Sequence, residues 1–237
     1  MKYKFIFILF FTLNLFSQDK KILVEYEVKV FEEENLFSDN SALKSLLNNA
    51  IKYSNSLSFS LLINNDKSKF FCNQNLINDS NGYSEKHIFP FIGYIGKVYT
   101  SSNYILKQHQ IISENFYTKD SLKDNWQITS QTKKIDGYLC YMAKNTYVVK
   151  NGEKQFNHKV IAWFCPDLPF AFGPNGYGNL PGLILELQVR NYLYGATKID
   201  INSSLSFNEE DDLKNIKIIT EEELNKKLDE FNNFDGN

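Results

Sequence analysis

Few side chains in this sequence have the spacing of a catalytic, metal-binding or cofactor-binding motif. His87, His109 and His158 fall on separate predicted elements and lack the spacing of metal ligands. The sequence contains no Gly-x-Ser-x-Gly elbow, His-Glu-x-x-His helix, phosphate-binding loop or Cys-x-x-Cys pair. Gly176-Tyr177-Gly178 superficially matches a dinucleotide loop, but a strand is predicted after it, where a helix would be needed to hold a pyrophosphate. We therefore expect no cofactor and no metal site, and the sequence nominates no catalytic residue.

Residues 166–182 form a candidate binding loop. They include four of the five prolines and four of the eleven glycines. Proline fixes φ and glycine admits positive φ, so the loop is predicted to be shaped and not floppy. Loops of this length are often functional. Two interpretations remain open: the loop binds a partner, or it is a rigid cap that closes one end of the sheet with its aromatic side chains. The candidate binding residues are Phe170, Phe172, Gly173, Pro174, Tyr177, Leu180, Pro181 and Gly182.

A hairpin is predicted directly before this loop. Residues 138–149 and 155–165 have the pattern of two strands, and the Asn151-Gly152 pair between them is a strong hairpin signal. The simplest register places Lys150 opposite Glu153. A bulge or a longer turn would shift this register.

Two of the three cysteines are candidates for a disulfide. In the simplest register Cys140 lies opposite Trp163, two residues from Cys165, and a shifted register would bring the two cysteines level. The alternative is two half-buried thiols. Cys72 is the expected odd cysteine, and a Cys140–Cys165 bond would stabilise the fold by about 3 kcal/mol in the chain-entropy model.

The elements that must position these residues are mostly strands, predicted from alternating apolar and polar residues. Further strands are expected at 22–30, 57–63, 67–72, 97–101, 104–112, 114–118, 126–133, 183–190 and 197–207, with a turn at 192–195. A short helix is expected at 42–53. A C-terminal helix that packs on the sheet is expected after the Thr220/Glu223 capping box. The acidic run 208–212 is expected to be a solvated loop and not a calcium site.

These elements predict a mainly β fold: a single antiparallel, meandering curved sheet or half-barrel with one short internal helix and a C-terminal helix. Antiparallel pairing is expected because the chain lacks the crossover helices that parallel strands need. Such a sheet can either wrap a filled core or line a concave apolar pocket, and both outcomes remain open.

The N-terminus predicts export. Lys2 and Lys4 precede an apolar run at 5–13, and Ser17 follows it, which is typical of a secretory signal peptide. We expect residues 1–17 to be this signal and residues 18–237 to form a single β-rich domain. No cysteine precedes Cys72, so no lipid anchor is expected, and no later segment could span a bilayer. The predicted location is periplasmic or extracellular.

Composition limits the partners. The formal charge is −2 and Arg190 is the single arginine, so a nucleic-acid partner is not expected. With 43% apolar and 15% aromatic residues, the chain has the composition of a packed domain.

Several motifs carry a family resemblance. Gly178-Asn179-Leu180-Pro181-Gly182-Leu183-Ile184 resembles the signature of the GLPGLI family, with Asn179 inserted. Upstream, Trp126-Gln127-Ile128, Asp136-Gly137-Tyr138, Ala162-Trp163-Phe164 and Pro166-Asp167-Leu168-Pro169 follow the family's order. The resemblance implies a secreted protein of Bacteroidetes-type bacteria and implies no activity.

Three classes of function follow from these observations. The first is a non-enzymatic binding or accessory protein of the envelope that uses the 166–182 loop against an envelope protein. The second is a carrier of an apolar ligand in the curved sheet. The third is an enzyme of hydrolytic type.

Overall fold

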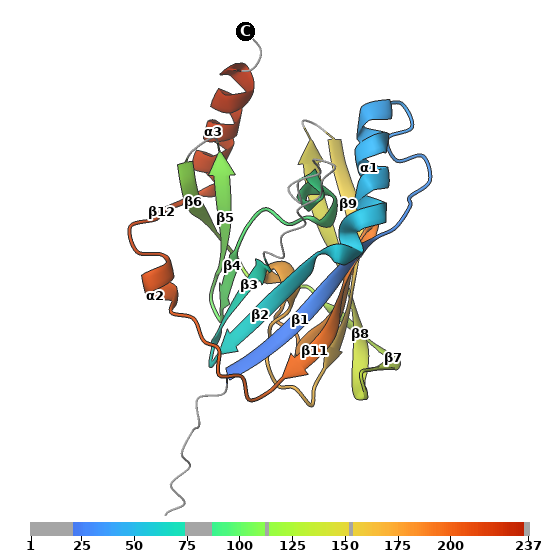
Figure 1. Ribbon diagram of the computed structural model, residues 1–237, viewed down its shortest axis with the longest axis vertical. Coiled ribbons are helices and arrows are strands. Elements are labelled where there is room, and N and C mark those ends of the chain that lie inside the picture. The colour runs from blue at the N-terminus through green and yellow to red at the C-terminus, as the bar shows by residue number, and fades with distance from the viewer. Residues whose placement is uncertain (1–20, 74–86, 112–113, 152–153, 235–237) are drawn as a thin grey trace, which may run out of the picture.

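A computed structural model describes residues 21–73, 87–111, 114–151 and 154–234 (Figure 1). The strands are β1 (Lys21–Val30), β2 (Ser58–Asn64), β3 (Lys67–Cys72), β4 (Val98–Ser101), β5 (Ile105–Ile111), β6 (Glu114–Asp120), β7 (Gln127–Ile135), β8 (Tyr138–Asn151), β9 (Lys154–Cys165), β10 (Leu183–Val189), β11 (Tyr192–Asp200) and β12 (Lys217–Ile219). The helices are α1 (Ser41–Tyr53), α2 (Glu209–Asp212) and α3 (Glu221–Phe234), with the 3₁₀ turns η1 (Ser54–Ser56), η3 (Phe89–Ile92) and η4 (Pro174–Gly176).

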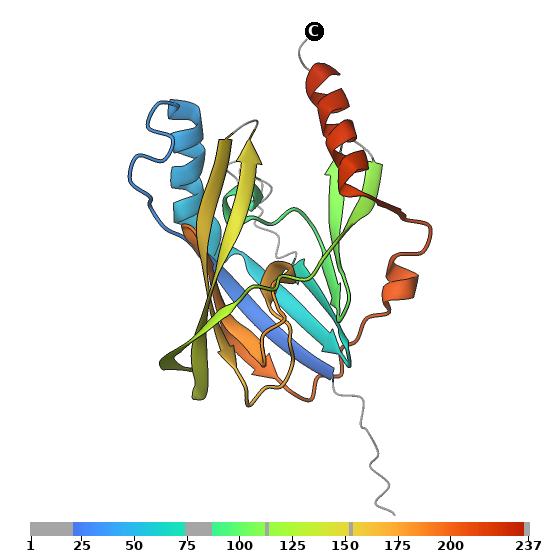
Figure 2. The same ribbon diagram turned by 180° about the vertical axis from the view of Figure 1, so that it is seen from behind.

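The strands form one sheet of 12 strands in the order β12-β6-β5-β4-β3-β2-β1-β11-β10-β9-β8-β7. Neighbouring strands are antiparallel except β12 and β6, which run parallel. Two meanders, β1 to β6 and β7 to β11, meet where β1 pairs with β11. The sheet is strongly curved (Figures 1 and 2). The predicted fold class is confirmed.

The main core lies on the concave face of this sheet. Val24, Tyr26 and Val28 of β1 are buried there, and the Tyr26 hydroxyl donates a hydrogen bond of 2.5 Å to the carbonyl of Ile184. Burial raises the pKa of Tyr26 far above its ordinary value. The rings of Phe59, Phe70 and Tyr194 come together beside it, with Phe59 stacked on Phe70 at 5.3 Å between centroids. Aromatic side chains therefore occupy the centre of the concave face.

The short internal helix is α1, as predicted from residues 42–53. Asn40 is its N-cap, because the Asn40 side chain accepts a hydrogen bond of 3.0 Å from the Leu43 backbone amide. Leu47 and Ala50 are buried on the face toward β1. The apolar stripe thus places the helix across one end of the sheet.

The predicted turn at 192–195 is wrong, since these residues belong to β11. Tyr194 is fully buried and its hydroxyl donates to the carbonyl of Ile92 at 3.1 Å, which fixes this segment in the core. The turn comes earlier, at Arg190 with φ of 51° and Asn191. Residues 201–207, predicted as the end of a strand, contain a turn and a bend.

The C-terminal helix α3 begins at its predicted capping box. The Thr220 amide donates to the Glu223 carboxylate at 2.9 Å, and the Glu223 amide donates to the Thr220 hydroxyl at 3.2 Å. The helix touches the sheet at its edge, where Lys227 pairs with Glu114 of β6, and Leu228 is 40% exposed. The helix was predicted to pack on the sheet, but it projects from the sheet edge and covers no face of the sheet (Figure 2).

No helix among the described residues is long and apolar enough to cross a membrane. The predicted leader, residues 1–17, lies outside the described residues.

Candidate functional site

The predicted binding loop, residues 166–182, is folded into the main core. Most of its candidate residues are buried, Phe170 is half-buried and Pro181 is exposed. Phe172 and Tyr177 are each 7% exposed and Leu180 is 2% exposed. Their rings and side chains are therefore not available to fill a pocket on a partner.

Specific contacts hold this loop in place. Phe172 forms a bridge with Gly178, and the Trp126 indole donates to the Gly178 carbonyl at 2.9 Å. The Asn175 side chain donates to the Gly93 carbonyl at 2.8 Å. A Cβ on Gly173 would lie 2.7 Å from the Ile184 Cβ, so the backbone approaches β10 as closely as only glycine allows. This geometry favours the cap over the binding loop, and binding by the loop stays a prediction.

The register of the β8–β9 hairpin differs from its simplest prediction. Asn151 pairs with Lys154, and Tyr141 pairs with Phe164. The turn is therefore displaced by one residue along the chain, and the turn residues 152–153 lie outside the described residues. Because a one-residue displacement of the turn moves each partner by two positions, the cysteine positions change with it.

Cys140 and Cys165 come level in this register. Cys140 directly precedes Tyr141 on β8 and Cys165 directly follows Phe164 on β9, and both cysteines are fully buried. Both are thiols in the structure, so the disulfide stays a prediction. Burial raises the pKa of Cys140 to about 12. Cys72, the predicted odd cysteine, lies half-buried at the end of β3.

The histidines do not converge. His109 stacks on Phe116, its Nε2 lies 2.8 Å from the Thr118 hydroxyl, and burial lowers its pKa. His158 lies on β9 and His87 is exposed before η3. In the described ranges, no group of three or more His, Cys, Asp or Glu side chains could hold a metal ion.

A part of the β8–β9 hairpin extends past its neighbours. β7 pairs with β8 only as far as Lys144, and β10 pairs with β9 only as far as Val160. Beyond these points, no other described strand pairs with either one. Residues 145–151 and 154–159 therefore form a two-stranded projecting ribbon, seen near α1 in Figures 1 and 2.

The projecting ribbon exposes large apolar side chains. Tyr147 is 41% exposed, and Val148 and Phe156 are each 44% exposed. Adjacent strand residues point to opposite faces, so Tyr147 and Val148 place apolar surface on both faces. The Lys123 ammonium lies 5.8 Å from the centroid of the Tyr147 ring. Because a two-stranded hairpin alone is marginally stable in water, contact with a partner would stabilise this ribbon.

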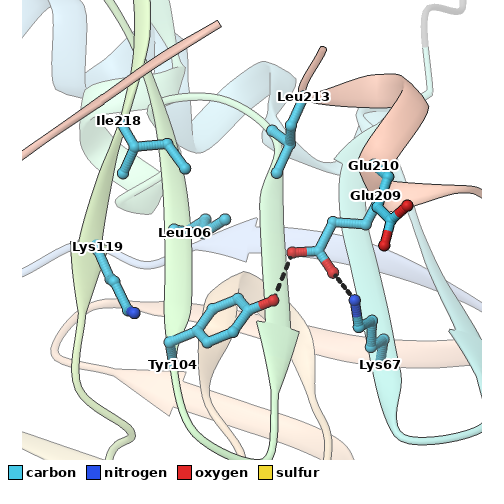
Figure 3. A pocket seen from close by; sticks show the side chains of 8 residues that line it. All are labelled: Lys67, Tyr104, Leu106, Lys119, Glu209, Glu210, Leu213 and Ile218. Carbon is cyan, nitrogen blue, oxygen red and sulfur yellow. Dashed lines mark hydrogen bonds and ion pairs between the residues drawn. The ribbon is translucent and has the colours of Figure 1, made fainter.

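The outer face of the β3–β6 half is covered by residues 207–219, which we call the C-terminal strap. Glu209 of α2 is 7% exposed, pairs with Lys67 at 2.6 Å and accepts a hydrogen bond from the Tyr104 hydroxyl at 2.8 Å (Figure 3). The hydrogen bond to Glu209 raises the pKa of Lys67. This carboxylate therefore anchors the strap to β3 and to the β4–β5 turn.

Asp212 repeats the arrangement one helical turn later. It pairs with Lys69 at 2.6 Å and accepts a hydrogen bond from the Tyr99 hydroxyl at 2.8 Å. Burial acts to raise the Asp212 pKa, but the bonds from Lys69 and Tyr99 outweigh it and the pKa is lowered. The acidic run was predicted to be a solvated loop, and for these two carboxylates that prediction is wrong.

The sequence carried a signal for this anchor that pattern analysis missed. Lys67 and Lys69 lie on one face of a strand, and Glu209 and Asp212 lie three residues apart, which is one face of a helix. Their opposite charges and similar spacing could have suggested the two ion pairs, although no local rule connects segments this far apart in the chain.

A cavity of about 490 Å³ lies beside the Glu209 anchor. Polar groups from β6 and α2, Lys119 and Glu210, line it together with the apolar side chains of Leu106 and Leu213 (Figure 3). Such a volume is within the range of small-molecule sites in proteins.

Comparisons with known proteins agree with the fold and name no activity. Residues 150–186, from the hairpin turn through the loop into β10, match the model of a family described as "Protein of unknown function (Porph_ging)". The name GLPGLI is not confirmed by this match, and no curated protein matches the chain.

Two crystal forms of PNGF-II are similar in structure. The C2 form gives a TM-score of 0.52 at 16% identity, covering 88% of this chain and 32% of PNGF-II. The P21 form gives 0.53 at 15% identity, covering 87% and 32%. The chain thus spans about a third of the length of PNGF-II, and at this identity the likeness shows the fold alone.

Proposed function

We propose that this chain is an exported, non-enzymatic binding or accessory protein of the bacterial envelope, and that it docks a protein partner on the projecting ribbon. One observation carries the proposal. The ribbon combines two unpaired strand edges with three exposed large apolar side chains, Tyr147, Val148 and Phe156.

The open edge of β9 indicates the mode of docking. The Lys159 carbonyl accepts a hydrogen bond from the Arg190 amide at 3.1 Å, and the edge beyond it, residues 154–158, faces no described strand. An extended segment can add to such an edge through backbone hydrogen bonds, while alternate side chains give specificity. The ribbon therefore suits an extended peptide segment of its partner.

The side chains near the ribbon indicate the chemistry of that segment. Lys144 and Lys159 are exposed beside Val148, so the exposed side of the ribbon is both basic and apolar. A segment that alternates apolar and acidic residues would complement it. We infer that the partner supplies such a strand.

The apolar leader at 5–13 supports export, and the scarcity of catalytic motifs supports a binding role. The alternative, a carrier of an apolar ligand in the curved sheet, has less support because aromatic rings occupy the centre of the concave face.

Site-specific photocrosslinking in the native bacterium tests the proposal. A photoreactive amino acid at position 148 should yield one defined crosslinked protein, whereas the same group at Leu205, which is 54% exposed outside the ribbon, should not. Phe156→Lys should remove the crosslink at 148, because a strand added at the β9 edge contacts both faces of the ribbon and Phe156 lies on the face opposite Val148. The substitution should not unfold the protein, because Phe156 is largely exposed.

The matched control is Leu205→Lys, which should leave the crosslink at 148 intact. Equal crosslinking at 148 and 205, or a crosslink that survives Phe156→Lys, would show that the ribbon does not dock a partner.

A further inference from the structure

We propose that the cavity beside the Glu209 anchor is a binding site for a small zwitterion, an amino acid or dipeptide with an apolar side chain. The cavity of about 490 Å³ lies between the C-terminal strap and the outer face of β5 and β6 (Figure 3). It shares no residue with the projecting ribbon, so the two proposals stand separately.

The floor of the cavity is fixed by groups that satisfy one another. Glu209 accepts from Tyr104 and pairs with Lys67, so these three side chains are held in place before any ligand arrives. The buried anchor thus supplies a rigid surface and leaves recognition to other groups, an arrangement that lowers the entropic cost of binding.

Two opposite charges at the cavity have no ion pair among the described residues. The Lys119 ammonium lies 5.0 Å from the centroid of the Tyr104 ring. Glu210 lies across the Glu209–Tyr104 pair from Lys119 in Figure 3. Lys119 can bind a carboxylate and Glu210 can bind an ammonium group, and charge-assisted contacts of this kind are the stronger ones. A ligand that carries both groups complements both.

The remaining wall of the cavity is apolar. Leu106 lies on β5 directly across from Lys119, and Leu213 and Ile218 of the strap approach from the other side. An apolar side chain between the two charged ends of the ligand would bury against this wall. The combination selects a zwitterion with an aliphatic side chain over a sugar or a simple anion.

Calorimetric titration of the purified protein with the dipeptide leucyl-leucine tests this site. The N-acetylated dipeptide lacks the ammonium group and the dipeptide amide lacks the carboxylate, and each should bind about tenfold more weakly. Lys119→Met should weaken the free dipeptide about tenfold and abolish the preference for it over the amide. Glu210→Gln should abolish the preference over the acetylated form.

Lys198→Met is the matched control, because Lys198 is a 63% exposed lysine paired with Glu25 outside the cavity. It should leave the affinity unchanged. No saturable binding of leucyl-leucine at millimolar concentration, or equal binding of all three compounds, would overturn the proposal.

Discussion

The regions at the two ends of β9 differ in the solvent exposure of their aromatic side chains. At the carboxyl end, residues 166–182 return into the core, and Phe172 and Tyr177 are each 7% exposed. At the amino end, the projecting ribbon leaves Phe156 at 44% exposed. Prolines, glycines and aromatic residues, which suggested recognition, close the core. The exposed apolar surface lies instead on the β8–β9 hairpin, whose sequence did not suggest binding.

The most severe test of this contrast is Gly182→Val at the cap end. Gly182 has φ of +155°, and a Cβ there would lie 2.5 Å from the Cys165 carbonyl carbon. A β-branched residue can neither adopt this φ nor avoid the strand beside it. We expect almost no soluble folded protein in expression and circular dichroism measurements. Gly137→Ala, where nothing lies within 4 Å, is the control and should cost only about 1 kcal/mol.

The next test compares one phenylalanine from each end. Phe172→Ala should lower the free energy of unfolding by about 3–5 kcal/mol, as buried aromatics do. Phe156→Ala should change it by about 0.5 kcal/mol or less, because the side chain is already largely in water. Urea denaturation of both variants measures the difference. Similar losses in both would mean that the ribbon is packed like the cap.

A disulfide would strengthen the cap end of β9 further. Cys140 and Cys165 are level on neighbouring strands, and a bond between them would add about 3 kcal/mol in the chain-entropy model. Because burial raises the Cys140 pKa to about 12, little thiolate forms in the folded protein, and the bond should form before folding is complete.

Thiol labelling of the unfolded, unreduced protein measures this bond. Protein from an oxidising compartment should label once, at Cys72, and Cys140→Ser should lower its stability by about 3 kcal/mol relative to the wild type. The same substitution should matter much less under reductant. Three labelled thiols would refute the disulfide.

The smallest expected effect concerns the outer face, where ion pairs add to the apolar packing of the C-terminal strap. The Asp212 pKa is lowered in the folded state, so the ionised carboxylate adds to the free energy of unfolding above about pH 4, its ordinary pKa. This contribution is lost as the pH falls through the lowered pKa. The side chain is 32% exposed, and solvent screening should keep the contribution below about 1 kcal/mol. The stability difference between wild type and Asp212→Asn should therefore shrink on acidification. A constant difference from pH 7 to pH 2 would exclude this role.

Local patterns predicted the elements well and their partners poorly. The alternation in residues 22–30 and the stripe in 42–53 match β1 and α1, because both patterns arise from burial on one face. Residues 192–195 were predicted to be a turn, but Tyr194 is held in the core by distant segments. Tertiary contacts therefore determine the strand conformation of residues 192–195.

The candidate site was harder to predict for the same reason. The loop was visible because proline and glycine are conspicuous, but whether its rings face water depends on the curvature of the whole sheet. The Glu209 anchor joins α2 to β3 and to the β4–β5 turn, and the ribbon is open only because β7 and β10 end early. Neither condition is written in a local stretch of sequence.

The pairing of β1 with β11 has a consequence for the order of folding. Leu23 lies beside Asp200, so the middle of the sheet joins two strands that are far apart in the chain, and it cannot close until β11 is available to pair with β1. Such non-local pairing makes folding slow. We propose that the protein is exported, and if it crosses a membrane before it folds, late pairing of β1 with β11 would keep the chain from folding before export. We expect refolding from urea to be slow, with β1–β11 contacts appearing in the final phase.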